Sequence, residues 1–111
     1  MGLGFQSSSS VSGTSTTVAE YTAFAGGGQG SATELLSRKN SVTTVATSGD
    51  SVKLLPAIKG VVQYVINNGA NTLELFPNTG DNFKGLAANI GVSLNAGQAI
   101  EFTCYSDGEF E

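Results

Sequence analysis

The stretch from residue 61 to residue 77 decides the fold, and it reads VVQYVINNGANTLELFP. Two runs rich in β-branched and other apolar residues, Val61 to Asn67 and Thr72 to Phe76, lie on either side of an Asn68-Gly69 pair. Runs of this kind predict strands, and Asn-Gly between them is a strong short signal for a turn. The stretch therefore predicts two strands with a tight turn between them.

The two predicted strands differ in their pattern of apolar residues. In the second strand, Leu73 and Leu75 alternate with residues that include Glu74, which predicts one buried face and one outward face. The first strand is apolar on both faces except at Gln63. That pattern is typical of a central strand or of a strand covered by a neighbouring subunit.

The same texture of short β-rich runs and turn residues extends over residues 41–111. The further candidate strands are Val42 to Thr47, Ser51 to Leu55, Asn82 to Lys84, Val92 to Leu94 and Ala99 to Tyr105. Short strands with turn signals roughly every 8 to 12 residues are typical of a sandwich or a barrel. We expect an all-β domain over residues 41–111, an antiparallel β-sandwich with a jelly-roll-like topology. An immunoglobulin-like topology is the alternative, because turn spacing does not specify strand pairing.

A short helix is predicted over residues 31–40. Ser31 and Glu34 form an S-x-x-E capping box, Leu35 and Leu36 follow, and Arg38-Lys39 carry positive charge near the expected C-terminal end. Two or three turns are marginal alone in water, so this helix must dock through its leucines.

Residues 1–30 differ from the rest of the chain. They are dense in Ser, Thr and Gly, with four consecutive serines at 7–10 and the run GGGQG at 26–30. A segment of this composition buries too little apolar surface to offset its backbone entropy. We expect an extended, flexible N-terminal arm that either orders against another subunit through its few aromatic residues or covers its own domain with them.

Charge and composition narrow the classes of partner. Charged residues make up only 13% of the 111 residues, against roughly 25% in an average soluble domain, and the formal net charge is −4. A weakly charged surface favours packing against other copies or neighbours. The five cations form no basic stripe and no apolar run approaches the ~20 residues that span a bilayer, so we expect neither direct nucleic-acid binding nor membrane association.

The residues for common catalytic chemistry are missing. The chain has no histidine and a single cysteine, which removes the commonest general base and the usual zinc ligands. Cys104 is predicted to be a buried thiol rather than a reactive one, since it follows Ile100 and Phe102 on the apolar face of its strand. The remaining carboxylates, Glu74, Asp81 and Glu101 among them, fit exposed strand and turn positions. We therefore predict no catalytic residues, no metal site, no cofactor and no enzymatic activity.

Three stretches and two shorter ones resemble a family of small virion proteins of tailed bacteriophages, the head decoration or cement proteins. The stretches are Thr43 to Leu54, Asn67 to Pro77 and Gly80 to Asn89, with Asn95-Ala96-Gly97 and Phe102-Thr103-Cys104 beyond them. The resemblance begins at Val42 and covers about two thirds of the whole chain. Residues 1–30 lie outside it. An extra Leu55 stands before Pro56, where the family pattern places its proline sooner.

The resemblance implies a jelly-roll-like sandwich that assembles as a homotrimer on the outer surface of a phage head. Its expected partner is the major capsid protein, and it is expected to be made in the cytoplasm of the host bacterium. The arm and the short helix are predicted to clamp adjacent capsid subunits. The candidate capsid-contact residues are Phe5, Tyr21, Phe24, Leu35 and Arg38. The alternative is a tail or fibre module that recognises host glycans, with Tyr64, Phe76 or Tyr105 as stacking platforms.

Overall fold

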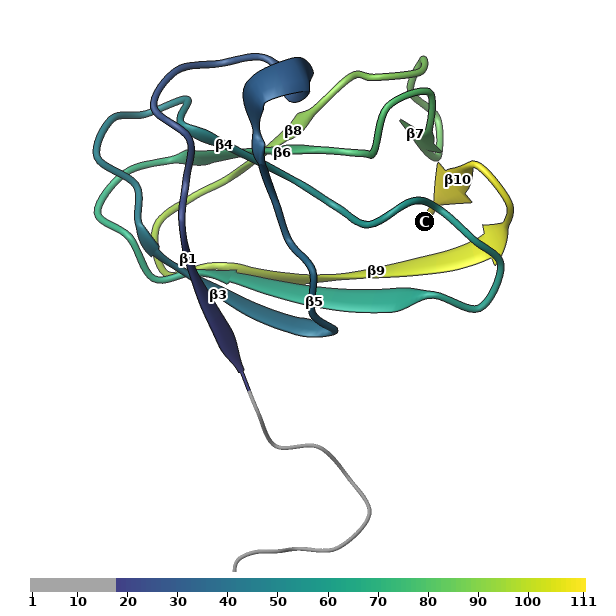
Figure 1. Cartoon of the computed structure of the whole chain (residues 1–111), viewed down its shortest axis with the longest axis horizontal. Coiled ribbons are helices and arrows are strands. Elements are labelled where there is room, and N and C mark those ends of the chain that lie inside the picture. The colour runs from purple at the N-terminus through teal and green to yellow at the C-terminus, as the bar shows by residue number, and fades with distance from the viewer. Residues whose placement is uncertain (1–17) are drawn as a thin grey trace, which may run out of the picture.

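Two β-sheets face each other in the computed structural model, which describes residues 18–111 (Figure 1). In spatial order, the larger sheet contains β1 (Ala19–Thr22), β3 (Lys39–Thr44), β5 (Val62–Asn67), β9 (Ala99–Ser106), β10 (Glu109–Phe110) and β7 (Asn82–Phe83). The smaller sheet contains β2 (Thr33–Glu34), β4 (Ser51–Lys53), β6 (Leu73–Phe76) and β8 (Val92–Leu94). A single 3-10 turn, η1 (Gln29–Ser31), is the only helical element among these residues. The prediction of an all-β chain is confirmed.

The first six strands wind as stacked coils. Odd-numbered strands β1, β3 and β5 pair in parallel in the larger sheet, and even-numbered strands β2, β4 and β6 pair in parallel in the smaller one. Each odd strand and the even strand that follows it therefore form one coil of a solenoid-like stack. The prediction of an antiparallel arrangement is wrong for these strands, because the Asn68-Gly69 turn carries the chain from one sheet to the other and forms no hairpin.

The C-terminal strands β8 and β9 extend the two sheets in the antiparallel direction. Strand β8 pairs antiparallel with β6, and β9 pairs antiparallel with β5. Strand β10 then pairs antiparallel with β9 and parallel with β7. Among the named strands, every antiparallel pair thus includes β8 or β9, and one isolated antiparallel bridge joins Phe24 and Ser51.

All seven strands predicted from the sequence exist, with ends that differ by a few residues. Strand β8 has the predicted bounds, and β3 begins at Lys39, three residues before the expected start. Strand β5 lies between β3 and β9, so the prediction of a central strand is confirmed. Strands β1, β2 and β10 were not predicted.

The predicted helix over residues 31–40 is wrong. Ser31 is the last residue of η1, and the segment then enters the smaller sheet as β2. The Leu35 N–H donates to the Lys53 carbonyl at 2.9 Å, which continues the pairing with β4. Leu35 is fully buried while Leu36 is exposed, an alternation that a strand produces. Sheet hydrogen bonds outweigh the local capping signal of a helix that is too short to be stable alone.

The boundary of the predicted arm also needs correction. Strand β1 begins at Ala19 and lies at the edge of the larger sheet, so residues 19–30 belong to the folded body. Local composition had indicated an arm, but strand pairing with β3 holds this segment in place. The remainder of the predicted arm, residues 1–17, lies outside the described residues.

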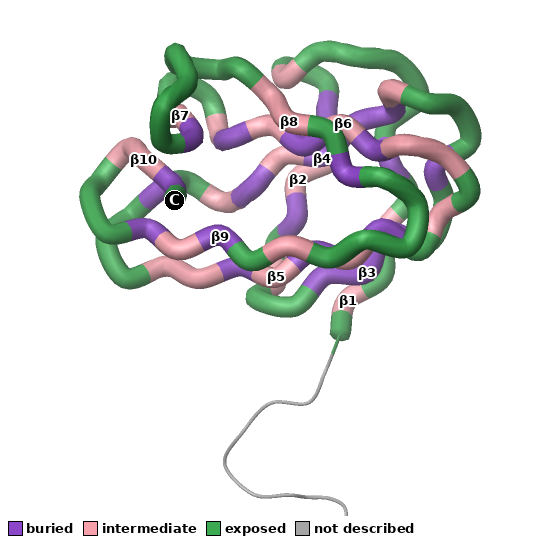
Figure 2. Tube along the Cα trace, turned by 180° about the vertical axis from the view of Figure 1, so that it is seen from behind, coloured by how far each residue is buried: buried purple, intermediate pink, exposed green. Residues whose placement is uncertain are grey.

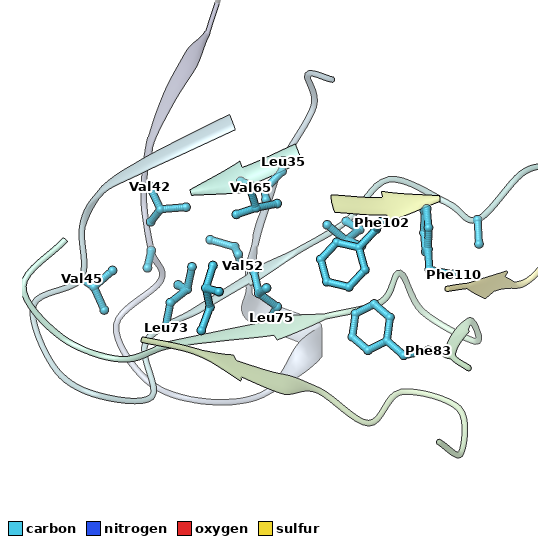
Figure 3. Packing of buried hydrophobic residues seen from close by; sticks show 14 of the residues in the cluster. Leu35, Val42, Val45, Val52, Val65, Leu73, Leu75, Phe83, Phe102 and Phe110 are labelled. Carbon is cyan, nitrogen blue, oxygen red and sulfur yellow. The ribbon is translucent and has the colours of Figure 1, made fainter. Parts of the chain in front are cut away.

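The hydrophobic core fills the space between the sheets, and Figure 2 shows buried residues in the strands of both sheets. Leu73 and Leu75 point into it from β6, as their alternation predicted, and Val65 and Phe102 face them from the larger sheet (Figure 3). At one end, the Phe83 and Phe102 rings stack with centroids 4.8 Å apart, and Phe110 meets Phe102 edge-on at 6.1 Å. Aromatic packing thus joins β7, β9 and β10 to the rest of the core.

Buried amide side chains hold the connections between the sheets. Gln63 on β5 is fully buried, and its Nε2 donates to the carbonyls of Leu35 at 3.0 Å and Ser37 at 2.8 Å. Its Oε1 accepts the Leu55 N–H at 2.8 Å. Three hydrogen bonds offset the cost of burying this amide, and they tie β5 to the segments after β2 and β4.

Consecutive turns also contact each other closely. The Asn71 Nδ2 donates to the carbonyls of Val45 at 2.8 Å and Ala46 at 3.0 Å. A Cβ placed on Gly69 would approach the Val45 Cγ2 to 2.6 Å, so only glycine fits there. The turn after β5 is therefore stacked directly on the turn after β3.

Candidate binding face on the larger sheet

The outward face of β5 is apolar. Val62, Tyr64 and Ile66 alternate with the inward-facing Gln63 and Val65, and all three outward side chains remain half-buried rather than fully covered. A strand with one solvated face ordinarily places polar residues on that side. The outer face of the larger sheet is therefore the unusual surface of this molecule.

A groove of about 590 Å³ runs over this face. It is lined by Val18, Lys39, Asn40, Tyr64, Val65, Ile66, Ala99, Ile100 and Glu101, and most of its lining is apolar. The groove crosses the centre of the sheet from the start of β1 to β9. An apolar groove with few polar groups at its rim suits a protein surface better than a polar ligand.

Charged side chains lie on both sides of Tyr64. In the strand register, Tyr64 is opposite Lys39 on β3 and opposite Glu101 on β9. The Arg38 guanidinium carbon lies 5.7 Å from the centroid of the Tyr64 ring, within range of a cation–π contact. Next to Tyr64, the β3 side is thus positive and the β9 side negative, while the exposed Glu20 on β1 lies beyond β3.

These charges make no ion pair with each other. The one salt bridge within residues 18–111 joins Lys84 and Glu111 at 3.3 Å, far from the groove in the sheet order. Lys39 and Glu101 are both exposed, and β5 separates their strands. The apolar centre is therefore flanked by opposite charges that are available to a partner.

The outer face of the smaller sheet is more polar. Its row across β4, β6 and β8 consists of Ser51, Glu74 and Ser93. Ser51 is buried and its hydroxyl donates to the Gly26 carbonyl at 3.1 Å, whereas the Ser93 hydroxyl donates to the Glu74 carboxylate at 3.2 Å. The neighbouring row contains Lys53 and a half-buried Phe76. This face has the composition of an ordinary solvated sheet surface.

The carboxylates considered for catalysis are far apart in the fold. Glu74 lies on the smaller sheet and Glu101 on the larger one, each on an outer face. The Asp81 Oδ2 accepts the Ala57 N–H at 2.7 Å, which gives this side chain a structural role. Within residues 18–111, no group of three or more acidic or cysteine residues is arranged to hold a metal ion.

Cys104 is buried, with 1% of its surface exposed, and its thiol donates to the Ser106 carbonyl at 3.0 Å. Burial raises the pKa of the Cys104 thiol, because the thiolate would lose its hydration. The prediction of a buried thiol is confirmed.

The candidate capsid-contact residues separate into different environments. Leu35 is fully buried in the core, so a surface role for it is wrong. Tyr21 packs against the core, and its hydroxyl accepts the Leu36 N–H at 2.9 Å. Phe24, with 43% of its surface exposed, and Arg38 remain at the surface, whereas Phe5 lies outside the described residues.

Sequence reasoning missed most of the groove. It named Tyr64 only as a possible glycan platform and Lys39 only as a charge near the end of a helix, and it did not single out Ile66 or Ala99. A signal was present in the run Val61 to Ile66, whose apolar residues on both faces indicated a central strand or one covered by a neighbour. Because Lys39 was expected at the end of a helix, its place on the outer face of a strand was not predicted.

Residues 18–111 contain no helix long and apolar enough to cross a membrane. Comparison with known proteins gives no relative: no family model, no curated protein and no solved structure matches the chain.

Proposed function

We propose that this chain is a decoration or cement protein of a tailed-phage head, a binding protein without catalytic activity. It binds the outer surface of the shell and bridges neighbouring major capsid protein subunits, with the homotrimer as the assembly that the family resemblance implies. The proposal rests on the resemblance of the ordered sequence stretches Thr43 to Leu54, Asn67 to Pro77 and Gly80 to Asn89 to that family. No cofactor, nucleic acid or membrane takes part in the proposed function.

The position of these stretches in the fold supports the proposal. Residues 43–54 and 67–77 contain the turns after β3 and β5, which contact each other through Asn71 and Gly69. The stretches therefore coincide with the contacts that stack one coil on the next.

The surface composition also favours a binding role. The larger sheet presents an apolar groove where a solvated sheet would be polar, and exposed apolar patches of this kind mark interaction sites. Several weak contacts made by linked copies would hold the protein on a shell, since each later contact becomes intramolecular.

The test is to add the purified full chain to heads and, separately, to tails of the phage that encodes it. We expect co-sedimentation with heads only, saturation at a fixed number of copies per shell, and shells that resist heating better when occupied. Imaging of intact particles then locates the bound chain. Binding to tails alone would overturn the proposal.

A truncation tests whether the N-terminal residues clamp the shell. The chain should be cut after residue 17, because a cut at Ser31 would also remove β1 from the larger sheet. We expect weaker shell binding without residues 1–17, and equal binding would contradict the clamp. Circular dichroism serves as the control that the truncated chain still folds.

A second candidate is a tail or fibre module that recognises host glycans. Tyr105 has 63% of its surface exposed on β9, and Tyr64 lines the groove, so two of the three predicted stacking platforms are accessible. Phe76 lies on the opposite sheet and does not join them. Binding to host cells that Tyr105→Ala abolishes would support this candidate over the first.

A further inference from the structure

We infer that the outer face of the larger sheet binds a second copy of this chain, face to face, about a two-fold axis parallel to β5. The inference stands on the groove and its charges and does not depend on the proposed function. If the inference holds, binding to a shell stays as proposed, but the assembly has two-fold rather than three-fold symmetry.

The apolar centre of the face is the first reason for inferring a dimer. Val62, Tyr64 and Ile66 form a row along β5, and Val18 and Ala99 extend the apolar surface to both sides. Two such sheets packed face to face, about 10 Å apart, would remove these side chains from water. The same row then contacts itself, as an isologous interface requires.

The charges on this face favour a second copy of the chain as its partner, and they fix the direction of the two-fold axis. Lys39 and Glu101 lie in one row on opposite sides of Tyr64. A two-fold axis along β5 exchanges the two sides of the sheet, so Lys39 of each copy lies opposite Glu101 of the other. The pair forms twice, and Arg38 adds a second positive group on the side that meets the acidic one.

The other axis in the contact plane gives the opposite result. A two-fold axis perpendicular to the strands would keep β3 opposite β3 and β9 opposite β9. Lys39 would then face Lys39, and Glu101 would face Glu101, which costs binding energy. The charge pattern is thus self-complementary in one orientation only.

Charge exchange between variants tests this arrangement. Sedimentation velocity of the full chain over a wide concentration range should show a monomer–dimer equilibrium. Lys39→Glu converts both contacts to pairs of acidic groups, and Glu101→Lys converts both to pairs of cations. Each variant alone should dimerise about tenfold or more weakly than the natural chain.

An equal mixture of the two variants should recover the natural affinity. In the mixed pair, the glutamate introduced at position 39 of one copy faces the lysine introduced at position 101 of the other. The remaining contact pairs a natural Glu101 with a natural Lys39. Lys53→Glu on the smaller sheet is the matched control and should leave the dimer unchanged. Circular dichroism confirms that each variant folds.

Several outcomes would overturn the inference. A monomer at every concentration, a trimer, or a mixture that binds no better than the single variants would each do so. A dimer that appears only after removal of residues 1–17 would show that this segment is the occupant of the face instead. Shell binding is measured in a separate assay, so either proposal can fail alone.

Discussion

Strands β5 and β6 follow each other in the same coil and carry opposite patterns. β6 buries Leu73 and Leu75 and turns Glu74 outward, as an ordinary half-buried strand does. β5 buries the amides of Gln63 and Asn67 and presents apolar side chains outward. The same coil therefore contains one strand that buries only apolar side chains and one that buries two amides on either side of Val65.

The difference shows what fixes the register of β5. A shift by one residue would turn Tyr64 and Ile66 inward, which hydrophobic burial alone would favour. It would also remove the amides from their backbone partners, including the bonds from the Asn67 Nδ2 to the carbonyls of Asn71 at 2.8 Å and Leu94 at 2.9 Å. The hydrogen bonds of the buried amides therefore support the observed register.

The largest effect should follow from truncating the buried face of β6. Leu75→Ala removes a fully buried side chain and leaves a cavity, so the free energy of unfolding should fall by about 2–5 kcal/mol. Urea unfolding followed by circular dichroism measures it, at a protein concentration low enough to keep the chain monomeric. A loss below about 1 kcal/mol would contradict the packing described for this strand.

The next effect tests the polar interior of β5. Gln63→Leu leaves the Leu55 N–H and two carbonyls without their partner, so the free energy of unfolding should fall by about 2–3 kcal/mol. Thr44→Leu is the control, because Thr44 is exposed at the end of β3 and its side chain makes no hydrogen bond within residues 18–111, and it should change stability by less than about 0.5 kcal/mol. A stabilised Gln63→Leu chain would mean that the amide does not hold the register.

On the outer face of β5, a polar substitution should have a smaller effect on stability and a large effect on association. Ile66→Ser changes a half-buried side chain, and the free energy of unfolding of the monomer should fall by about 1 kcal/mol. The dimer should weaken about tenfold or more, measured by sedimentation velocity. Phe76→Ser on the smaller sheet is the matched control, and equal weakening by both would remove the distinction between the two faces.

The smallest effect is expected on the outer face of β6. Glu74→Gln keeps an acceptor for the Ser93 hydroxyl, and the free energy of unfolding should stay within about 0.5 kcal/mol of the natural value. Association should not change either. A marked loss in either measurement would give the smaller sheet a role that its surface does not suggest.

The sequence was informative about individual strands and faces. Turn residues bounded seven strands, and alternation placed Leu73, Leu75, Phe102 and Cys104 correctly in the core. It was uninformative about pairing, because parallel stacking depends on contacts between residues far apart, such as Asn71 with Val45. The predicted helix failed for the same reason, since the Lys53 carbonyl that holds Leu35 in the sheet lies outside any local window.

The candidate face was predictable only in part. The run Val61 to Ile66 indicated a central strand or one covered by another subunit, but its row partners come from β3 and β9. Lys39 and Glu101 are adjacent to Tyr64 only through strand register. Sequence alone therefore indicated an unusually apolar strand without indicating the charges that flank it.

The coiled architecture has a consequence for how such a protein can change in length. An added coil placed between β4 and β5 would present the same backbone edges to its neighbours as the coils already there. Duplication of one short segment would thus extend both sheets in steps of one strand spacing, about 4.8 Å. The antiparallel strands β8 and β9 end the series of coils on their side. Inserted coils would therefore lengthen the molecule while its C-terminal end keeps its shape.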